Sequence, residues 1–272
     1  MNEFDLYKER MRVRGLTRRD TALQREQRMI LDKMRHSLSF HHAIVNDEER
    51  DVVIINSDNL NEKMIYALPG EDIANGAYVD WMNQMWLVTE KDYNNEVYTR
   101  AKMFQCNYLL KWVDSDHVIH EQWAFIEDGT KYLTGELEDR NFVITRGDSR
   151  IAITLQRNEH TAKLGRLDRF LVDDPLSGVM LAYANTKPLK FAGVYGKTKD
   201  ELEGVVKFVC QEVNSTDDDN FELGIADYYK HFTHETDAEG NPVLRPETPA
   251  ISANDPKDPT EGRRDWLSHV PE

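Results

Sequence analysis

The sequence predicts a mainly β protein. It should contain small β-barrel or sandwich modules, preceded by N-terminal helices and followed by an extended, proline-rich, acidic C-terminal arm. From about residue 40, short runs rich in Val, Ile, Tyr and Trp alternate with Asn, Asp and Gly, which is typical of strands and turns. Hydrophobic residues make up 40% of the 272 residues, which is enough to bury a core. After residue 235, prolines and acidic residues accumulate and argue against packed structure.

Residues 1–38 are expected to form a helical segment. Asn2 can cap a first helix, and Gly15 can end it. Thr17 or Asp20 can then cap a longer helix, whose apolar stripe consists of Ala22, Leu23, Ile30, Leu31 and Met34. Because this stripe is too thin to form a core alone, we expect the helix to lie on a neighbouring domain or a neighbouring subunit.

A first β-barrel-like module is expected over residues 39–140. Its clearest hairpin has Asn83-Gln84 between two aromatic-rich arms, Tyr78–Met82 and Met85–Glu90. The predicted strands of this module are 41–46, 51–56, 63–68, 77–82, 85–90, 96–106, 107–113 and 117–126.

A second β module is expected over residues 141–213. One hairpin is predicted to turn at Gly147-Asp148 within 141–155, and further strands are predicted at 167–172, 178–184, 188–194 and 204–213. Three segments of the first module have weak counterparts in the second, in the same order. Segments 79–80, 86–89 and 103–107 correspond to 172–173, 181–186 and 207–211. Duplication and coincidence among β-rich segments both remain open.

Residues 214–272 are expected to form an acidic linker and an extended arm. The arm carries five prolines, and Trp266, Leu267 and Val270 near its end either anchor it on another surface or belong to a loose tail.

Charge is distributed unevenly along the chain. Residues 1–40 carry ten basic and six acidic side chains, whereas residues 212–272 carry five basic and fifteen acidic ones. The opposite charges of these two segments suggest protein contacts, either between copies of the chain or with different partners. Two faces that are each solvated independently would explain the charges equally well. The formal net charge of -15 disfavours a general nucleic-acid binder, which relies on basic side chains to contact phosphates.

The sequence shows no run of 18 apolar residues and no apolar stretch near its start. We therefore expect no membrane contact and no secretion signal, with synthesis in the cytoplasm. The two cysteines, Cys106 and Cys210, lie in apolar β runs and are expected to be buried, free thiols.

Motifs of catalysis and cofactor binding are absent from the sequence. It contains no phosphate-cradling glycine loop, no nucleophile elbow and no HExxH motif. We therefore expect a protein that is not an enzyme, with no catalytic residues and no cofactor.

The histidines and acidic runs do not form a recognisable metal motif. His117 and His120 are three residues apart in a predicted strand and so should point to opposite faces. His231 and His234 could share a helix face, but no third ligand is close in sequence. Asp217–Asp219 lacks the glycine and the final glutamate of an EF-hand loop and is expected to be a solvated turn. We expect no metal site.

Three segments together carry a family resemblance: residues 1–20, beginning MNEFDLYKER, residues 76–112, beginning GAYVDWMNQMW, and residues 217–229, DDDNFELGIADYY. They resemble neck or head–tail connector proteins of tailed bacteriophages of Gram-positive hosts, of the head-closure or stopper type. The resemblance covers roughly residues 1–230. The second β module and the arm depart from the pattern, because small stoppers are shorter than this chain.

The resemblance implies a β-barrel subunit of a homo-oligomeric ring in the virion neck. Such a ring joins a portal or adaptor protein to tail proteins, and genomic DNA passes through it without sequence-specific binding. A net negative charge is compatible with that role, because an acidic or neutral channel wall keeps DNA mobile.

Two alternatives are open, one within this class and one of a different class. The chain could be a tail-completion, tail-terminator or baseplate component. It could instead be a hydrolase or carbohydrate-binding β protein of host-recognition type, because exposed aromatic side chains can stack on sugars. The candidates are Trp81, Trp86, Trp112 and Trp123, although their Val, Leu and Tyr neighbours favour packing in the core.

A third alternative is an OB-like nucleic-acid module at residues 98–112, where basic and aromatic residues alternate. Three basic residues, Arg100, Lys102 and Lys111, support it.

Overall fold

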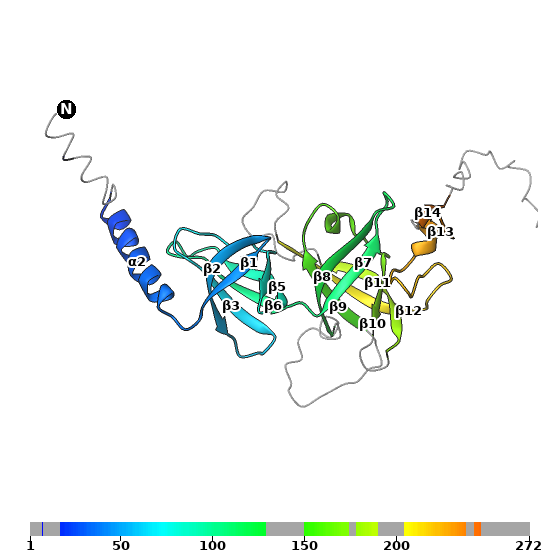
Figure 1. Ribbon diagram of the computed structural model, residues 1–272, viewed down its shortest axis with the longest axis horizontal. Coiled ribbons are helices and arrows are strands. Elements are labelled where there is room, and N and C mark those ends of the chain that lie inside the picture. Colours follow the sequence, from blue (N-terminus) through cyan, green and yellow to red (C-terminus); the bar gives the residue numbers. More distant parts are fainter. Residues whose placement is uncertain are drawn as a thin grey trace, which may run out of the picture.

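Two β-barrels lie side by side along the long axis of the molecule, with a helix at one end and a short β-hairpin at the other (Figure 1). The structure is a computed structural model, and it describes residue 7 and residues 17–128, 150–173, 178–189, 204–237 and 242–245. The prediction of a mainly β protein built from small barrels is confirmed.

The N-terminal helix α2 (Arg18–Arg35) begins at the predicted cap. The Thr17 hydroxyl accepts a hydrogen bond from the Asp20 N–H at 3.1 Å, and the Asp20 carboxylate accepts one from the Thr17 N–H at 3.0 Å. These two bonds form a capping box, which satisfies N–H groups that no helix turn can satisfy. The expected first helix, between Asn2 and Gly15, lies outside the described residues apart from Tyr7.

The first barrel is a closed sheet of six antiparallel strands in the order β1-β2-β3-β6-β5-β4. Its strands are β1 (Phe40–Val45), β2 (Glu48–Asn56), β3 (Glu62–Ala67), β4 (Tyr78–Trp81), β5 (Gln84–Asp92) and β6 (Arg100–Gln105). Pairing of β1 with β4, at Ile44 with Asp80 and Val45 with Val79, closes the barrel. Side chains that alternate along these strands fill its interior, among them Val52, Ile65, Val79, Val88 and Met103.

The β4–β5 hairpin occurs where the sequence predicts it, but its turn is one residue earlier. Trp81 pairs with Gln84, and the two turn residues Met82 and Asn83 have φ angles of 53° and 57°. Two successive positive φ angles match the twist of a tight hairpin, and Asn tolerates this conformation well.

The second barrel consists of six antiparallel strands in the order β10-β11-β12-β9-β8-β7. They are β7 (Tyr108–Val113), β8 (Ile119–Asp128), β9 (Arg150–Gln156), β10 (Arg169–Asp173), β11 (Met180–Leu189) and β12 (Val205–Val213). Its core includes Leu110, Ile153, Leu155, Phe170 and Phe208. Unlike the first sheet, it is open between its edge strands β7 and β10, and we call this gap the seam.

The two barrels have the same strand order. Reading the second sheet from β7 gives β7-β8-β9-β12-β11-β10, which matches β1-β2-β3-β6-β5-β4 strand for strand. The pairing register also shifts at Thr89 in β5 and at Thr186 in β11, which are equivalent strands. The three weak sequence correspondences fall on the equivalent pairs β4 and β10, β5 and β11, and β6 and β12. This agreement favours duplication over coincidence.

The grouping of strands into barrels differs from the expected modules 39–140 and 141–213. Strands β7 and β8 lie within the first expected module, yet β8 pairs with β9 and both belong to the second sheet. The boundary between the sheets therefore falls at Cys106–Asn107. Evenly spaced β runs do not reveal which strand pairs with which, so the sequence alone did not place this boundary. The predicted turn at Gly147-Asp148 lies outside the described residues.

Close backbone contact joins the barrels. The Gly204 N–H donates to the Asn75 carbonyl at 2.8 Å, and a Cβ atom on Gly76 would lie 1.9 Å from the Gly204 carbonyl oxygen. Phe104 and Phe125 stack with ring centroids 4.9 Å apart, and a small apolar cluster around Leu87 spans the junction.

The chain after β12 packs on the second barrel at first, in contrast to the expected linker over 214–272. It forms the short helix α3 (Tyr228–His231), and Ile225, Tyr228 and Phe232 are buried. A small hairpin of β13 (Phe232–Thr236) and β14 (Pro242–Leu244) follows. The rest of the expected arm, including Trp266, lies outside the described residues.

Candidate functional site

Polar side chains gather where the seam of the second barrel meets the β7–β8 turn. Asp114 follows β7 directly and is buried, and its Oδ1 accepts hydrogen bonds from the N–H groups of Asp116 and Val118 at 2.9 and 3.0 Å. These bonds fix the turn and hold the carboxylate in one orientation, because a short Asp side chain can satisfy the backbone two residues later. The second oxygen, Oδ2, is left to face other side chains.

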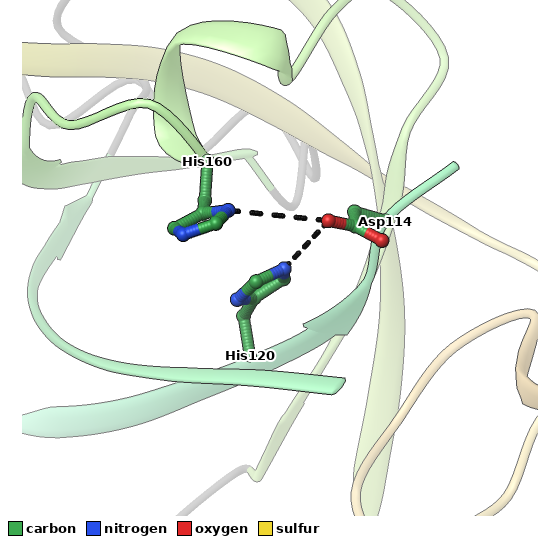
Figure 2. Close-up of side chains that lie close together, drawn as sticks. All are labelled: Asp114, His120 and His160. Atoms are coloured by element: carbon green, nitrogen blue, oxygen red, sulfur yellow. Dashed lines mark hydrogen bonds and ion pairs between the residues drawn. The ribbon is translucent and has the colours of Figure 1, made fainter. Parts of the chain in front are cut away.

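Two histidines approach Asp114 from different parts of the chain (Figure 2). His120 comes from the start of β8, and its Nε2 lies 2.7 Å from Asp114 Oδ2. His160 comes from the connection between β9 and β10, and its Nδ1 lies 3.9 Å from the same oxygen. The two imidazole rings stack with centroids 4.1 Å apart. The three ligand atoms lie within 4.8 Å of one another. We call these residues the Asp-His-His cluster.

The electrostatics of the cluster favour an ionised Asp114. Burial by itself raises the pKa of this carboxyl group, but hydrogen bonds from His120 and from the Val118 and Asp116 N–H groups outweigh it and lower the pKa to about 2. Asp114 therefore offers a fixed negative oxygen, while the side chain of His160 is 47% exposed and leaves the cluster open to solvent.

The cluster sits at one end of the open seam. A cavity of about 290 Å³ lies there, lined on one side by Trp112 and Asp114 and on the other by Asp168 and Phe170. At the opposite end, the Tyr108 hydroxyl bridges the strands, accepting from the Asp173 N–H at 3.2 Å and donating to the Leu171 carbonyl at 3.4 Å. A side chain thus bridges the seam at the Tyr108 end, whereas in the first barrel backbone pairing of β1 with β4 closes the equivalent gap.

The segment 214–232 covers this end of the barrel through a buried ion-pair group. Arg169 on β10 donates to Asp219 at 2.8 and 2.9 Å and to Asp227 at 2.5 Å. Asp219 is buried, so the run Asp217–Asp219 is not simply the expected solvated turn. From the same segment, His231 lies 2.9 Å from His117, nitrogen to nitrogen, and burial together with His117 lowers the pKa of His231.

A broad acidic groove lies on the first barrel. Its volume is about 1010 Å³, and it runs along β1, β2 and the β4–β5 turn beside Trp81. Six carboxylates line it: Glu48, Glu49, Asp51, Glu71, Asp72 and Asp80. Ion pairs partly balance this charge, because Arg50 binds Glu48 at 2.6 Å and Lys91 binds Asp72 at 2.7 Å. An excess of negative charge remains, and we call this surface the acidic groove.

Helix α2 has no buried residue and extends away from the first barrel (Figure 1). Its contacts with the barrel are polar: Arg19 forms a bidentate ion pair with Glu96 at 2.7 Å, and the Gln27 amide donates to the Glu96 carbonyl at 3.4 Å. The apolar stripe predicted from the sequence is therefore only partly covered by the described part of the chain: Leu23, Ile30, Leu31 and Met34 are half-buried, and Ala22 is exposed.

The tryptophans divide between core and surface. Trp86 and Trp112 are buried in the two cores, as the packing interpretation predicts, whereas Trp81 is partly buried and Trp123 is 40% exposed. The thiols of Cys106 and Cys210 are buried, and burial raises the pKa of each to about 12. A thiol with so high a pKa is a poor nucleophile at neutral pH.

The basic residues of the OB-like interpretation are already paired. Arg100 binds Asp92 at 3.0 Å, Lys102 binds Glu62 at 3.2 Å and Lys111 binds Glu121 at 2.8 Å. These pairs reduce the positive potential that a nucleic-acid backbone needs. No helix in the described part of the chain is both long and apolar enough to cross a membrane.

The sequence did not reveal the Asp-His-His cluster. In the sequence, the nearest histidine to His120 is His117, three residues away. The structure instead brings His120 to Asp114, six residues away, and to His160, forty residues away. A possible signal was the polar sequence Asp114-Ser115-Asp116-His117 between two strands, since an Asp that begins a turn is often oriented by the backbone.

Comparison with known proteins finds one similarity, in the part of the chain that forms helix α2 and the first barrel. Residues 21–105 match the family model of the YomX N-terminal domain, a phage-derived family. The match begins within α2 and ends with β6, so it covers most of the helix and the whole of the first barrel. No curated protein and no solved structure matches the chain. Helix α2 and the first barrel are thus similar to a domain of a phage-derived protein family.

Proposed function

We propose that the chain is a structural protein of a tailed-phage virion, and that it forms a homo-oligomeric head–tail connector ring of the head-closure type. In this role it joins a portal or adaptor protein to tail proteins, and it has no reaction to catalyse. Three features support the proposal: the similarity to a phage-derived domain, the tandem barrels joined by close backbone contacts, and a helix without a buried side chain.

Helix α2 carries the proposal. A helix of 18 residues is marginally stable alone in water, because most helix stability in proteins comes from packing an amphipathic face. This helix has a good cap and an apolar stripe, yet none of its residues is buried. It is about 27 Å long at 1.5 Å per residue, long enough to reach across a neighbouring subunit. A neighbouring copy or partner protein would supply the missing cover.

The acidic groove of an adjacent copy is the surface that fits α2 best. The helix carries six basic and three acidic side chains, and the groove carries six carboxylates against the nearby Arg50 and Lys91. One face of each copy would then meet a different face of the next. Such heterologous contacts generate rings when the rotation closes.

The charge distribution supports a DNA channel rather than a DNA-binding surface. The net charge is -15, and the basic residues at 98–112 are paired with carboxylates. A channel wall of this kind would repel phosphates and let DNA slide through without gripping it.

A charge-swap experiment tests the subunit contact. In phage particles carrying Arg25→Glu with Arg28→Glu, we expect loss of head-to-tail joining, because the helix would then repel the groove. Adding Glu49→Lys with Asp80→Lys should restore joining. Arg166→Glu, an exposed charge change on the second barrel, serves as the matched control and should have no effect.

Electron microscopy of these particles provides the measurement. Heads that are filled but carry no tails in the helix variant, together with rescue by the groove variant, support the ring. A reconstruction that places the chain elsewhere on the particle, such as the tail tip or baseplate, would overturn the connector role.

One observation favours a second candidate function, carbohydrate binding. Trp81 lies beside the carboxylates of the acidic groove, and an aromatic ring next to carboxylates is a common arrangement for sugars. Glycan-array binding that is lost in Trp81→Ala and kept in Trp123→Ala would support this function. Absence of binding by the wild-type protein would dismiss it.

A further inference from the structure

We propose that the Asp-His-His cluster binds one divalent transition-metal ion, with zinc the best match, and that the ion fastens the open seam of the second barrel. The donors are a carboxylate oxygen and two imidazole nitrogens, which suit zinc well. Three protein ligands leave a fourth position to water.

The distances between the donor atoms fit such an ion. Zinc bonds of about 2.0–2.1 Å in a tetrahedral arrangement place neighbouring ligand atoms roughly 3.3 Å apart. The observed separations from Asp114 Oδ2 are 2.7 Å to His120 Nε2 and 3.9 Å to His160 Nδ1. They lie on either side of this value, and all three donor atoms lie within 4.8 Å of one another. Rotation of the stacked imidazole rings, with atomic movements of about 1 Å, would aim both nitrogens and the carboxylate oxygen at one ion.

The surroundings hold the donors in place and leave a route of entry. Two backbone N–H groups orient the Asp114 carboxylate, and its side chain is only 5% exposed. The His120 side chain is 12% exposed and packs with the Trp112 ring at 5.4 Å between centroids. His160 is 47% exposed, so an ion can enter from its side. Ligands that are fixed before binding reduce the cost of ordering them.

The position of the cluster gives the ion a structural task. Asp114 and His120 belong to the β7–β8 hairpin, whose strand β7 borders the seam. His160 belongs to the connection that runs from β9 to β10, the strand on the other side of the seam. The first barrel closes the equivalent gap by pairing β1 with β4, and the second sheet has no such closure. A bound ion would tie this connection to the β7–β8 hairpin through coordinate bonds, at the end of the seam opposite Tyr108.

Binding is tested on the full-length protein after treatment with a chelator. Titration with zinc alone, followed by calorimetry, should give one site per chain, and cobalt should give the visible absorption of a tetrahedral site. In His160→Gln, we expect at least tenfold weaker zinc binding. This residue is half exposed, so its replacement should leave the fold intact, as circular dichroism would verify.

Two control variants separate this site from other histidine pairs. His42→Asn removes the surface pair of His42 with Asp51 on the first barrel, and His231→Asn removes the pair of His231 with His117. Both should bind zinc as tightly as the wild type. If zinc fails to bind the wild-type chain stoichiometrically, or if His231→Asn abolishes binding while His160→Gln does not, the proposal is overturned.

Hydrogen exchange tests separately whether the ion fastens the seam. Hydrogen exchange at β7 and β10 should slow several-fold when zinc is added to the wild-type protein, and should not change in His160→Gln. Exchange at β1 and β4 should be insensitive to zinc, because backbone pairing already closes that barrel. Zinc binding without slower exchange at the seam would refute the fastening role.

Discussion

At the residue scale, a few side chains and one glycine pair decide how the tandem barrels are held. Gly76 lies so close to the Gly204 backbone that a side chain on Gly76 would collide with it. Asp219 and Arg169 join the segment after β12 to β10. Asp114 holds the β7–β8 turn and faces two histidines.

Replacing Gly76 by alanine should destabilise the junction between the barrels strongly. The new Cβ would lie 1.9 Å from the Gly204 carbonyl oxygen, which is backbone and cannot move alone. Gly70→Ala is the matched control, since Gly70 also has a positive φ, of 92°, but has open space around its Cβ position. We expect the control to cost about 1–2 kcal/mol, from backbone strain alone. Thermal unfolding should show a clearly larger loss in Gly76→Ala, and equal losses would contradict the contact.

Replacing Asp219 by asparagine should destabilise the second barrel. Burial raises the pKa of Asp219, but hydrogen bonds from the Asp227 and Thr216 N–H groups and from Arg169 outweigh it, so the pKa lies below its usual 3.8. A lowered folded-state pKa stabilises the protein above the unfolded value, and this stability is lost as pH falls through the folded value. We expect Asp219→Asn to cost about 2 kcal/mol or more at pH 7, because Arg169 loses a buried partner.

Unfolding by urea at several pH values measures this effect. The difference between wild type and Asp219→Asn should be full at neutral pH and should shrink below the usual carboxyl pKa. A difference that stays constant down to the most acidic conditions would show that ionisation of Asp219 is not its cause.

Both thiols should be unreactive in the folded protein. Cys106 and Cys210 are buried, and burial raises the pKa of each to about 12, so the thiolate is scarce at neutral pH. A colorimetric thiol reagent should modify neither cysteine at pH 7 in native buffer and both in denaturant. Rapid modification of the native protein would contradict the burial of these side chains.

At the element scale, the seam between β7 and β10 distinguishes the barrels. The two sheets have the same strand order and a register shift at an equivalent threonine, but hydrogen-bonded pairing closes only the first. In the second, the Tyr108 hydroxyl bridges β7 and β10 at one end, and the Asp-His-His cluster lies at the other end.

Removing the hydroxyl of Tyr108 should therefore weaken the second barrel selectively. Tyr108→Phe keeps the ring but leaves the Asp173 N–H without this acceptor, and we expect a loss of about 1 kcal/mol. Hydrogen exchange should become faster at β10, while exchange in the first barrel should stay unchanged. Uniform acceleration across both barrels would indicate a different role for the residue.

At the scale of the whole molecule, the shape is a row in which α2 projects from one barrel and a small hairpin ends the other (Figure 1). The acidic groove and the basic helix lie in the part of the chain that is similar to a phage-derived domain. This arrangement places complementary charges on one domain, and it motivates the proposed contact between copies.

The features that were predicted correctly from the sequence depend on interactions between residues that are close in the chain. The capping box at Thr17 and Asp20 depends on residues three apart, and the β4–β5 hairpin depends on a tight turn between aromatic strands. Burial of Cys106 and Cys210 follows from their apolar neighbours. Such features can be predicted because they involve residues close in the chain, where spacing alone fixes which groups meet.

Only the tertiary structure decided which strands share a barrel and which polar groups meet. β7 and β8 belong to the second sheet because β8 pairs with β9, across residues 129–149, and no periodicity encodes that choice. His160 reaches Asp114 for the same reason, since the order of strands around the barrel sets the distance between them. The sequence by itself determined the mainly β fold class, the helix cap and the local turns. Long-range pairing of backbones determined the cluster, the seam and the groove, because these depend on contacts between residues far apart in the chain.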